Sequence, residues 1–243
     1  MPEEAAPRAW RTVLEHVERD LLDGRLAPGD RLPGERDLAT SLHVGRSSVR
    51  EALRVLEVMG LIRTGTGSGP HAGAIVIATP NGGMQALLRL QVAAQGFPIG
   101  DVVQTRLVLE GAVAASLAHS ETRDLSGAER FLDAMDDVAL SPEDFLALDR
   151  QFHLALAEAS SNTVITAMMA GLRTAIESYV TQGAALIEDW PAMADRLRSE
   201  HRAVTEAIHA GDAASATTLI HNHITGYYTA TGLVPEAHPI PEI

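Results

Sequence analysis

The apolar residues of this chain recur with two different spacings, which divide the sequence into parts. In the first 60 residues and again from residue 84 to about 231 they fall three and four positions apart, as on one face of an α-helix. Between residues 61 and 78, two short runs of strand-forming residues flank a glycine-rich stretch. The pattern predicts a mainly α fold with one small β segment near the N-terminal end.

The first part should hold three short helices before the β segment. The first has one apolar stripe, formed by Trp10, Val13, Leu14, Val17, Leu21 and Leu22. The other two lie within Leu32–Thr64, where Gly45 permits a tight turn between them. Ser48, with Glu51 three residues later, is typical of a capping box at the start of the third helix. We interpret the pair as a helix-turn-helix.

Arginines and serines stand where a helix-turn-helix meets DNA. Arg46 opens the second helix of the pair and Arg50 follows one turn later, so both side chains can point into a major groove. Ser47 and Ser48 can reach phosphate or base edges, and Arg36 can hold the flanking backbone. On spacing alone, the alternative is a small helical hairpin whose arginines are only solvated.

The β segment is expected to form a wing. Leu61–Arg63 begins the first strand and Ala74–Ala78 forms the second. The intervening tip, Thr64–His71, contains no lysine or arginine. Contacts from this tip to phosphate would therefore depend on backbone amides and hydroxyl groups.

The run LPGERDLATSLHVGRSSVREALRVLEVMGLI, preceded by LAPGDR, resembles the winged-helix domain of the GntR family of bacterial transcription regulators. The family's pattern G-x-L-x-P-G-x-x-L-P-S-E-R-x-L-A is met from Gly24 to Ala39, except that Gly34 replaces the serine. The resemblance implies DNA contacts by Arg36, Arg46, Ser47, Ser48 and Arg50.

Composition limits the possibilities further. No long apolar run or signal-like N-terminus is present among the 243 residues, so we expect a cytoplasmic protein that does not enter membranes. The absence of cysteine excludes disulfides and thiolate metal sites.

The charges are distributed unevenly along the chain. Residues 1–78 hold 10 arginines against 11 acidic residues, whereas residues 79–243 hold 9 arginines against 21 acidic residues. Because residues 1–78 carry almost no net charge, we expect them to bind DNA through a local arginine cluster and as part of a dimer.

The second part is expected to be an all-helical bundle. We predict a winged-helix domain at 8–78, a linker at 79–83 including Asn81-Gly82-Gly83, a helical domain at 84–231 and a loose tail at 232–243. The predicted helices of the bundle are 83–95, 99–119, 123–138, 142–159, 162–188, 191–209 and 212–230. Gly211 should end one helix, and Asp212 should cap the next.

Four polar residues interrupt the apolar faces of the bundle. Asp149 and His153 are four residues apart on one helix, whereas His201 and His223 each share an apolar stripe of another helix. They could form a metal site, or each histidine could be an ordinary hydrogen-bonded core residue. His221 is a rival to His223, although its face is less apolar.

The same residues resemble the FCD ligand-binding domain that accompanies one GntR subfamily. The matching motifs are DRQFH from Asp149, ASSN from Ala159, EHR from Glu200 and the final His223. The resemblance implies metal ligation by Asp149, His153, His201 and His223. A divalent ion would suit these ligands, with zinc as the first choice and nickel or manganese as alternatives.

The resemblance also implies an effector site. Arg106 matches an arginine that often faces the effector cavity in this subfamily, although it could simply pair with Glu110 along its helix. Asn162 belongs to the matching ASSN motif and is a second candidate for binding the effector. Because many members of this subfamily respond to small carboxylates, the resemblance implies that the effector is a small organic acid.

The sequence therefore predicts a ligand-responsive repressor, not an enzyme. It would bind a palindromic operator in double-stranded DNA as a homodimer, and a carboxylate metabolite at the metal site would modulate that binding. One alternative is a metal-dependent, hydrolase-like enzyme, since open metal coordination positions can activate water. Another is a regulator whose metal is purely structural.

Overall fold

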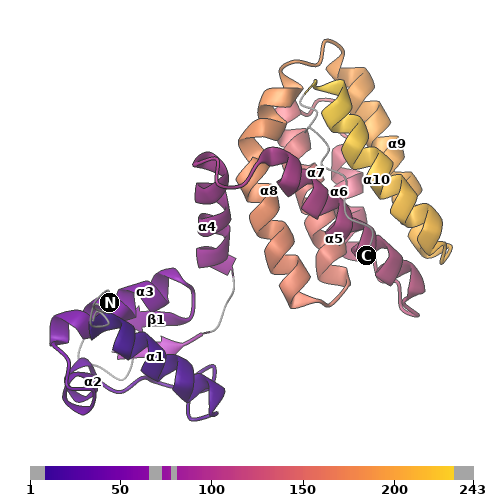
Figure 1. Ribbon diagram of the computed structural model, residues 1–243. Coiled ribbons are helices and arrows are strands. Elements are labelled where there is room, and N and C mark those ends of the chain that lie inside the picture. The colour runs from indigo at the N-terminus through magenta and orange to yellow at the C-terminus, as the bar shows by residue number, and fades with distance from the viewer. Residues whose placement is uncertain (1–8, 66–72, 78–80, 233–243) are drawn as a thin grey trace, which may run out of the picture. The chain divides into compact units, whose positions relative to one another are not determined.

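The computed structural model describes residues 9–65, 73–77 and 81–232, and these are mainly helical (Figure 1). The chain divides into two compact units, Met1–Met84 and Gln85–Ile243, and each has its own hydrophobic core. The fold class is thus as predicted. The expected wing tip (66–72), the start of the expected linker and the tail after Gly232 lie outside the described residues.

The described part of the first unit contains three helices and one antiparallel strand pair. Its elements are α1 (Ala9–Leu22), α2 (Glu35–Ser41), α3 (Arg46–Val58), β1 (Ile62–Gly65) and β2 (Gly73–Val76). Its core is built from apolar residues of all five, namely Val13, Val17, Leu38, Val49, Leu53, Leu56, Ile62, Ala74 and Val76. Leu22, the last residue of α1, is 80% exposed, so the buried stripe of that helix ends before it.

The turn between α2 and α3 differs from the prediction. His43, not Gly45, takes the left-handed conformation, with φ of 53°. Gly45 has φ of −70° and ψ of 147° and stands at the N-cap of α3. The amide of Ser48 bonds to the Gly45 carbonyl, so Ser48 already lies in the first helical turn and the predicted capping box is wrong.

The two strands pair in antiparallel orientation and follow the helix-turn-helix in the sequence. Ile62 pairs with Val76 and Gly65 pairs with Gly73. Ile62 and Val76 both point into the core of the first unit, which fixes the register because a shift by one residue would expose them. The backbone of Leu32 donates to the carbonyl of Ala74 and ties the start of the helix-turn-helix to β2.

Helix α4 (Asn81–Ala93) begins earlier than predicted. Asn81-Gly82-Gly83, expected to be linker, form its first turn. A Cβ added to Gly83 would lie 2.5 Å from the carbonyl oxygen of Val58 and 2.7 Å from Cα of Met59. Only glycine allows this close approach to the end of α3.

The second unit holds the remaining helices. They are α5 (Ile99–His119), α6 (Ser126–Met135), α7 (Pro142–Ala159), α8 (Thr163–Ala184), α9 (Trp190–His209) and α10 (Ala213–Ala230). Helix α10 packs against α5 and α9, and α7 packs against α6 and α8. The described helices include none with the length and hydropathy needed to cross a bilayer.

Each helix predicted for the bundle is present, and the differences are at the ends. Asp212 caps α10 as predicted, because its side chain accepts the amide of Ser215. Helix α6 begins at Ser126 rather than 123, since Arg123 has φ of 40°, outside the helical region. Helix α8 stops at Ala184, four residues before the predicted end.

Candidate functional site

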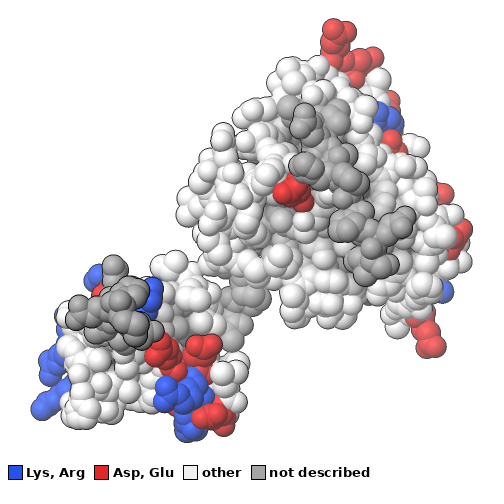
Figure 2. Space-filling model, in the orientation of Figure 1, with Lys and Arg blue, Asp and Glu red and all other residues white. Residues whose placement is uncertain are grey.

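The helix-turn-helix presents its predicted DNA-contacting residues toward solvent. Arg36, Arg46, Ser47 and Arg50 are exposed, and Ser48 is half-buried. Figure 2 shows Arg side chains along the edge of the first unit over α2, whereas the visible face of the second unit is largely uncharged. This exposure is what DNA contact requires, and the contacts themselves stay a prediction.

The four predicted metal ligands converge in the core of the second unit. Asp149 and His153 come from α7, His201 from α9 and His223 from α10, and all four are buried. Each offers one ligand atom, and these four atoms lie within 4.8 Å of one another. Nε2 of His223 is 3.2 Å from Nε2 of both other histidines, and Oδ1 of Asp149 is 3.0 Å from Nε2 of His201. Donors that are each about 2 Å from one ion have about this separation.

Two carboxylates behind the histidines show that the cluster suits a cation. Glu200 Oε2 lies 2.9 Å from Nδ1 of His223, and Glu110 Oε2 lies 2.5 Å from Nδ1 of His153. The Nδ1–H of a neutral His223 donates to Glu200, and this tautomer leaves a lone pair on its Nε2, which faces the other ligand atoms. A cation among these atoms would be coordinated by that lone pair and by the carboxylate of Asp149. Carboxylates in this position also orient metal-bound histidines.

The charge states of the cluster match metal ligation. Burial, reinforced by the neighbouring His223, lowers the pKa of His201 to about 4, and burial also lowers the pKa of His223. Burial alone would raise the pKa of Asp149, but His153, His201 and Arg173 hold it well below its ordinary value. Near neutral pH, His201 and His223 are therefore neutral imidazoles and Asp149 is an ionised carboxylate, the forms that bind metals.

His221 lies outside this cluster. Its Nε2 is 2.8 Å from the backbone carbonyl oxygen of Leu107 on α5. It also lies against Gly111, where an added Cβ would come within 2.6 Å of the ring nitrogen. Of the two rival histidines on α10, His223 is the one that faces the other three ligands.

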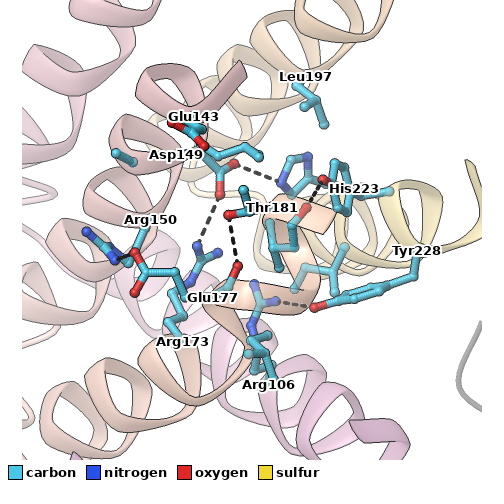
Figure 3. Close-up of a pocket in the computed structure, with 16 residues that line it drawn as sticks. Arg106, Glu143, Asp149, Arg150, Arg173, Glu177, Thr181, Leu197, His223 and Tyr228 are labelled. Atoms are coloured by element: carbon cyan, nitrogen blue, oxygen red, sulfur yellow. Dashed lines mark hydrogen bonds and ion pairs between the residues drawn. The ribbon is translucent and has the colours of Figure 1, made fainter. Parts of the chain in front are cut away.

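A cavity of about 70 Å³ borders the cluster. Asp149 and His223 belong to its lining, as do Arg106, Arg150, Arg173 and Tyr228 (Figure 3). In the figure, Arg173 points from α8 toward Asp149, and Arg106 extends from α5 to the hydroxyl of Tyr228. Several water molecules, or a small organic acid that displaces them, would fit this volume.

Arg106 pairs with Glu110 along its helix and also lines the cavity, and its role in binding an effector stays a prediction. Its Nε donates to Oε1 of Glu110 at 2.8 Å, and its Nη1 lies 3.1 Å from the hydroxyl of Tyr228. Burial alone would lower the pKa of Arg106, but the neighbouring Glu110 carboxylate raises it, so the guanidinium stays charged.

Arg173 was missed by the sequence reasoning. It is only 6% exposed, its Nη1 donates to Oδ2 of Asp149 at 3.1 Å, and its Nε and Nη2 have no hydrogen-bond partner. A buried guanidinium with unpaired donors beside a cavity is suited to bind an anion. It is also the one charged residue between Thr163 and Ile176 on α8, and this isolated charge was the available signal.

Asn162 lies at the start of α8, and its role in binding an effector stays a prediction. It does not line the cavity. Its side-chain oxygen accepts the amides of Val164 and Ile165 and so caps the start of α8, because an N-cap residue satisfies otherwise unpaired amides of the first turn. Its place in the ASSN motif has this structural explanation.

Comparisons with known proteins agree with the two units. The family model described as "Bacterial regulatory proteins, gntR family" matches residues 10–71, and the model described as "FCD domain" matches residues 101–226. An Escherichia coli (strain K12) protein whose name describes an L-lactate dehydrogenase operon regulatory protein is 30% identical over 226 residues, which are 92% of this chain and 86% of that protein. The HTH-type transcriptional regulator LutR of Bacillus subtilis (strain 168) is 29% identical over 205 residues, 84% of this chain and 92% of LutR.

A solved structure has the same fold. The Streptococcus agalactiae GntR structure superposes with a TM-score of 0.56 at 23% identity, and the match covers 90% of this chain and 98% of that one. These similar proteins are regulators and not enzymes, so the metal-dependent hydrolase alternative has no support.

Proposed function

Because this chain belongs to the GntR family of bacterial regulatory proteins and carries an FCD domain, it is a transcription regulator, and we propose that it senses a small carboxylate. In this proposal a homodimer binds a palindromic operator and represses transcription. The effector occupies the cavity of the second unit and releases the protein from DNA. The single observation that carries the proposal is that two residues of the metal-binding cluster also line an arginine-rich cavity.

A divalent ion, with zinc as the first choice and nickel or manganese as alternatives, would be held by Asp149, His153, His201 and His223. When bound, it supplies coordination positions for a carboxylate oxygen of the effector. Asp149 serves two purposes, because Oδ1 faces the histidines while Oδ2 accepts from Arg173. Arg173 thereby fixes the orientation of the carboxylate ligand at the border of the cavity.

The arginines explain why the effector should be an acid. Arg106 and Arg173 are both buried in the lining. Nε and Nη2 of Arg173 have no hydrogen-bond partner, although Nη2 lies 3.7 Å from Oε2 of Glu110. A neutral molecule would leave these charged donors unpaired, whereas a carboxylate accepts two parallel hydrogen bonds from a guanidinium. Tyr228 can hold a hydroxyl group of the effector, since its own hydroxyl lies beside Arg106.

Effector binding can change DNA affinity only if the effector and DNA prefer different conformations of the protein. The effector must bind better to one arrangement of the two winged helices of a dimer than to the other. By reciprocity, operator DNA must then weaken effector binding by the same factor. This reciprocity gives the proposal a quantitative test.

We expect a small carboxylate to bind the wild-type protein and to lower its operator affinity. Calorimetry with hydroxy acids, sugar acids and dicarboxylates measures the first effect, beginning with L-lactate because of the named Escherichia coli relative. Lactamide, which has the same shape without the charge, is the matched control and should not bind. Gel shifts with a DNA site selected from a random library measure the second effect.

The His201→Ala variant removes one proposed metal ligand and so tests whether effector binding in the cavity requires the metal. Its folding is verified by circular dichroism before titration. An acid that keeps full affinity for this variant, or that leaves the operator affinity of the wild type unchanged, would contradict the proposed mechanism.

Arg46→Ala should weaken specific operator binding by about 1–3 kcal/mol if this side chain reads a base edge. Arg36→Ala should instead weaken binding to operator and to unrelated DNA alike, because a phosphate contact carries no sequence information. Gel shifts of both variants on both kinds of DNA measure the difference. Unchanged operator affinity in Arg46→Ala would refute the role assigned to α3.

A further inference from the structure

An ion pair crosses the turn of the helix-turn-helix. Glu35 is the first residue of α2, and its Oε2 accepts from Nε of Arg50 on α3 at 2.8 Å. The side chains of Glu35 and Arg50 are 41% and 60% exposed. Such exposed pairs contribute little to stability because water competes for both charges. Stability therefore does not explain a contact between an acidic residue and an arginine in the DNA-facing motif.

The geometry of the contact gives the arginine a defined orientation. The hydrogen bond to Glu35 uses Nε of Arg50. The edge of the guanidinium formed by the two Nη nitrogens remains available for other acceptors. That edge is a pair of parallel N–H donors, which matches the O6 and N7 acceptors of guanine in the major groove. A guanidinium that is already oriented loses less side-chain entropy when it binds.

We propose that Glu35 is a positioning residue that makes Arg50 read a guanine of the operator. The inference rests on the proposed function, in which α3 enters the major groove. Glu35 has a second effect through its charge. It partly neutralises Arg50 and repels nearby phosphates, so it disfavours binding to arbitrary DNA, which depends on phosphate contacts. Both effects raise the ratio of operator affinity to non-specific affinity.

The test compares this affinity ratio in full-length variants, measured by fluorescence anisotropy at one fixed salt concentration. Glu35→Ala should lower the ratio by about 10-fold, with a loss on operator DNA and a small gain on unrelated DNA. Asp37→Ala is the matched control. It removes the same charge from the same first turn of α2 but is not the partner of Arg50. Asp37→Ala should leave the ratio unchanged.

A double variant shows whether Glu35 acts through Arg50. Arg50→Ala should lower the ratio by itself, and adding Glu35→Ala should then cause no further decrease. The inference is overturned if Glu35→Ala keeps or increases the ratio, or if its effect persists in the Arg50→Ala background. Failure of the proposed function looks different, because the wild-type protein would then show no preference for any selected DNA site.

Discussion

Removing the metal with a chelator is expected to lower the melting temperature of the second unit by about 10 °C. The four ligands join α7, α9 and α10, so an ion that binds only the folded state stabilises all three helices together. At a free metal concentration about 1,000 times the dissociation constant, this stabilisation is about 4 kcal/mol. A change of 1 kcal/mol shifts the melting temperature of a domain of this size by about 2–4 °C.

Scanning calorimetry of the protein with and without chelator measures this shift. His223→Ala should abolish the response to metal. His221→Ala is the matched control, since it removes a histidine from the same helix that faces Leu107 instead of the cluster, and it should keep the response. Metal-free protein whose melting temperature is unaffected by zinc, nickel and manganese would contradict the site.

The sequence predicted that Asp149, His153, His201 and His223 gather in the core because the main signal for this cluster is local. Asp149 and His153 are one helical turn apart, and His201 and His223 each interrupt an apolar stripe, so their burial follows from the 3.6-residue period. The period does not say that three helices bring these stripes to one point. Their resemblance to the FCD motifs supplied that information.

The surroundings of the cluster could not be predicted in the same way. Glu110, Arg173 and Tyr228 lie on α5, α8 and α10. The contacts of Arg173 with Glu110 and of Tyr228 with Arg106 join residues more than 50 positions apart. Nothing in the spacing along one helix indicates which charges will meet across a bundle. Arg173 still gave a usable sign, because a lone charge in a helical stretch without other charges needs a partner if it is buried.

The sequence predicted the cap of α10 correctly but not the turn before α3. Asp212 could be recognised because it follows Gly211 at a break in the period. At the helix-turn-helix, several residues could adopt the turn conformation, and His43 took the left-handed position while Gly45 stayed extended. The core contacts of Leu38 and Val49 position the two helices, and the turn adapts to them.

Glu110 is the residue that holds the buried charges together. It is 3% exposed, its Oε1 accepts from Arg106, and its Oε2 lies 2.5 Å from Nδ1 of His153 and 3.7 Å from Arg173. Burial alone would raise its pKa, but Arg106, His153 and Arg173 hold the pKa well below its ordinary value. Glu110 is therefore ionised at neutral pH and balances two buried arginines.

Glu110→Gln should destabilise the second unit by about 3–5 kcal/mol, because Arg106 and Arg173 would then share one buried carboxylate, Asp149. Scanning calorimetry should show a loss of about 10 °C in melting temperature. Metal affinity should fall by about 10–100-fold, because His153 loses the charged carboxylate beside its Nδ1. Asp101→Asn, an exposed charge loss on the same helix, should change neither quantity. A variant with unchanged stability would mean that the arginines do not depend on Glu110, and unchanged metal affinity would mean that His153 is oriented without it.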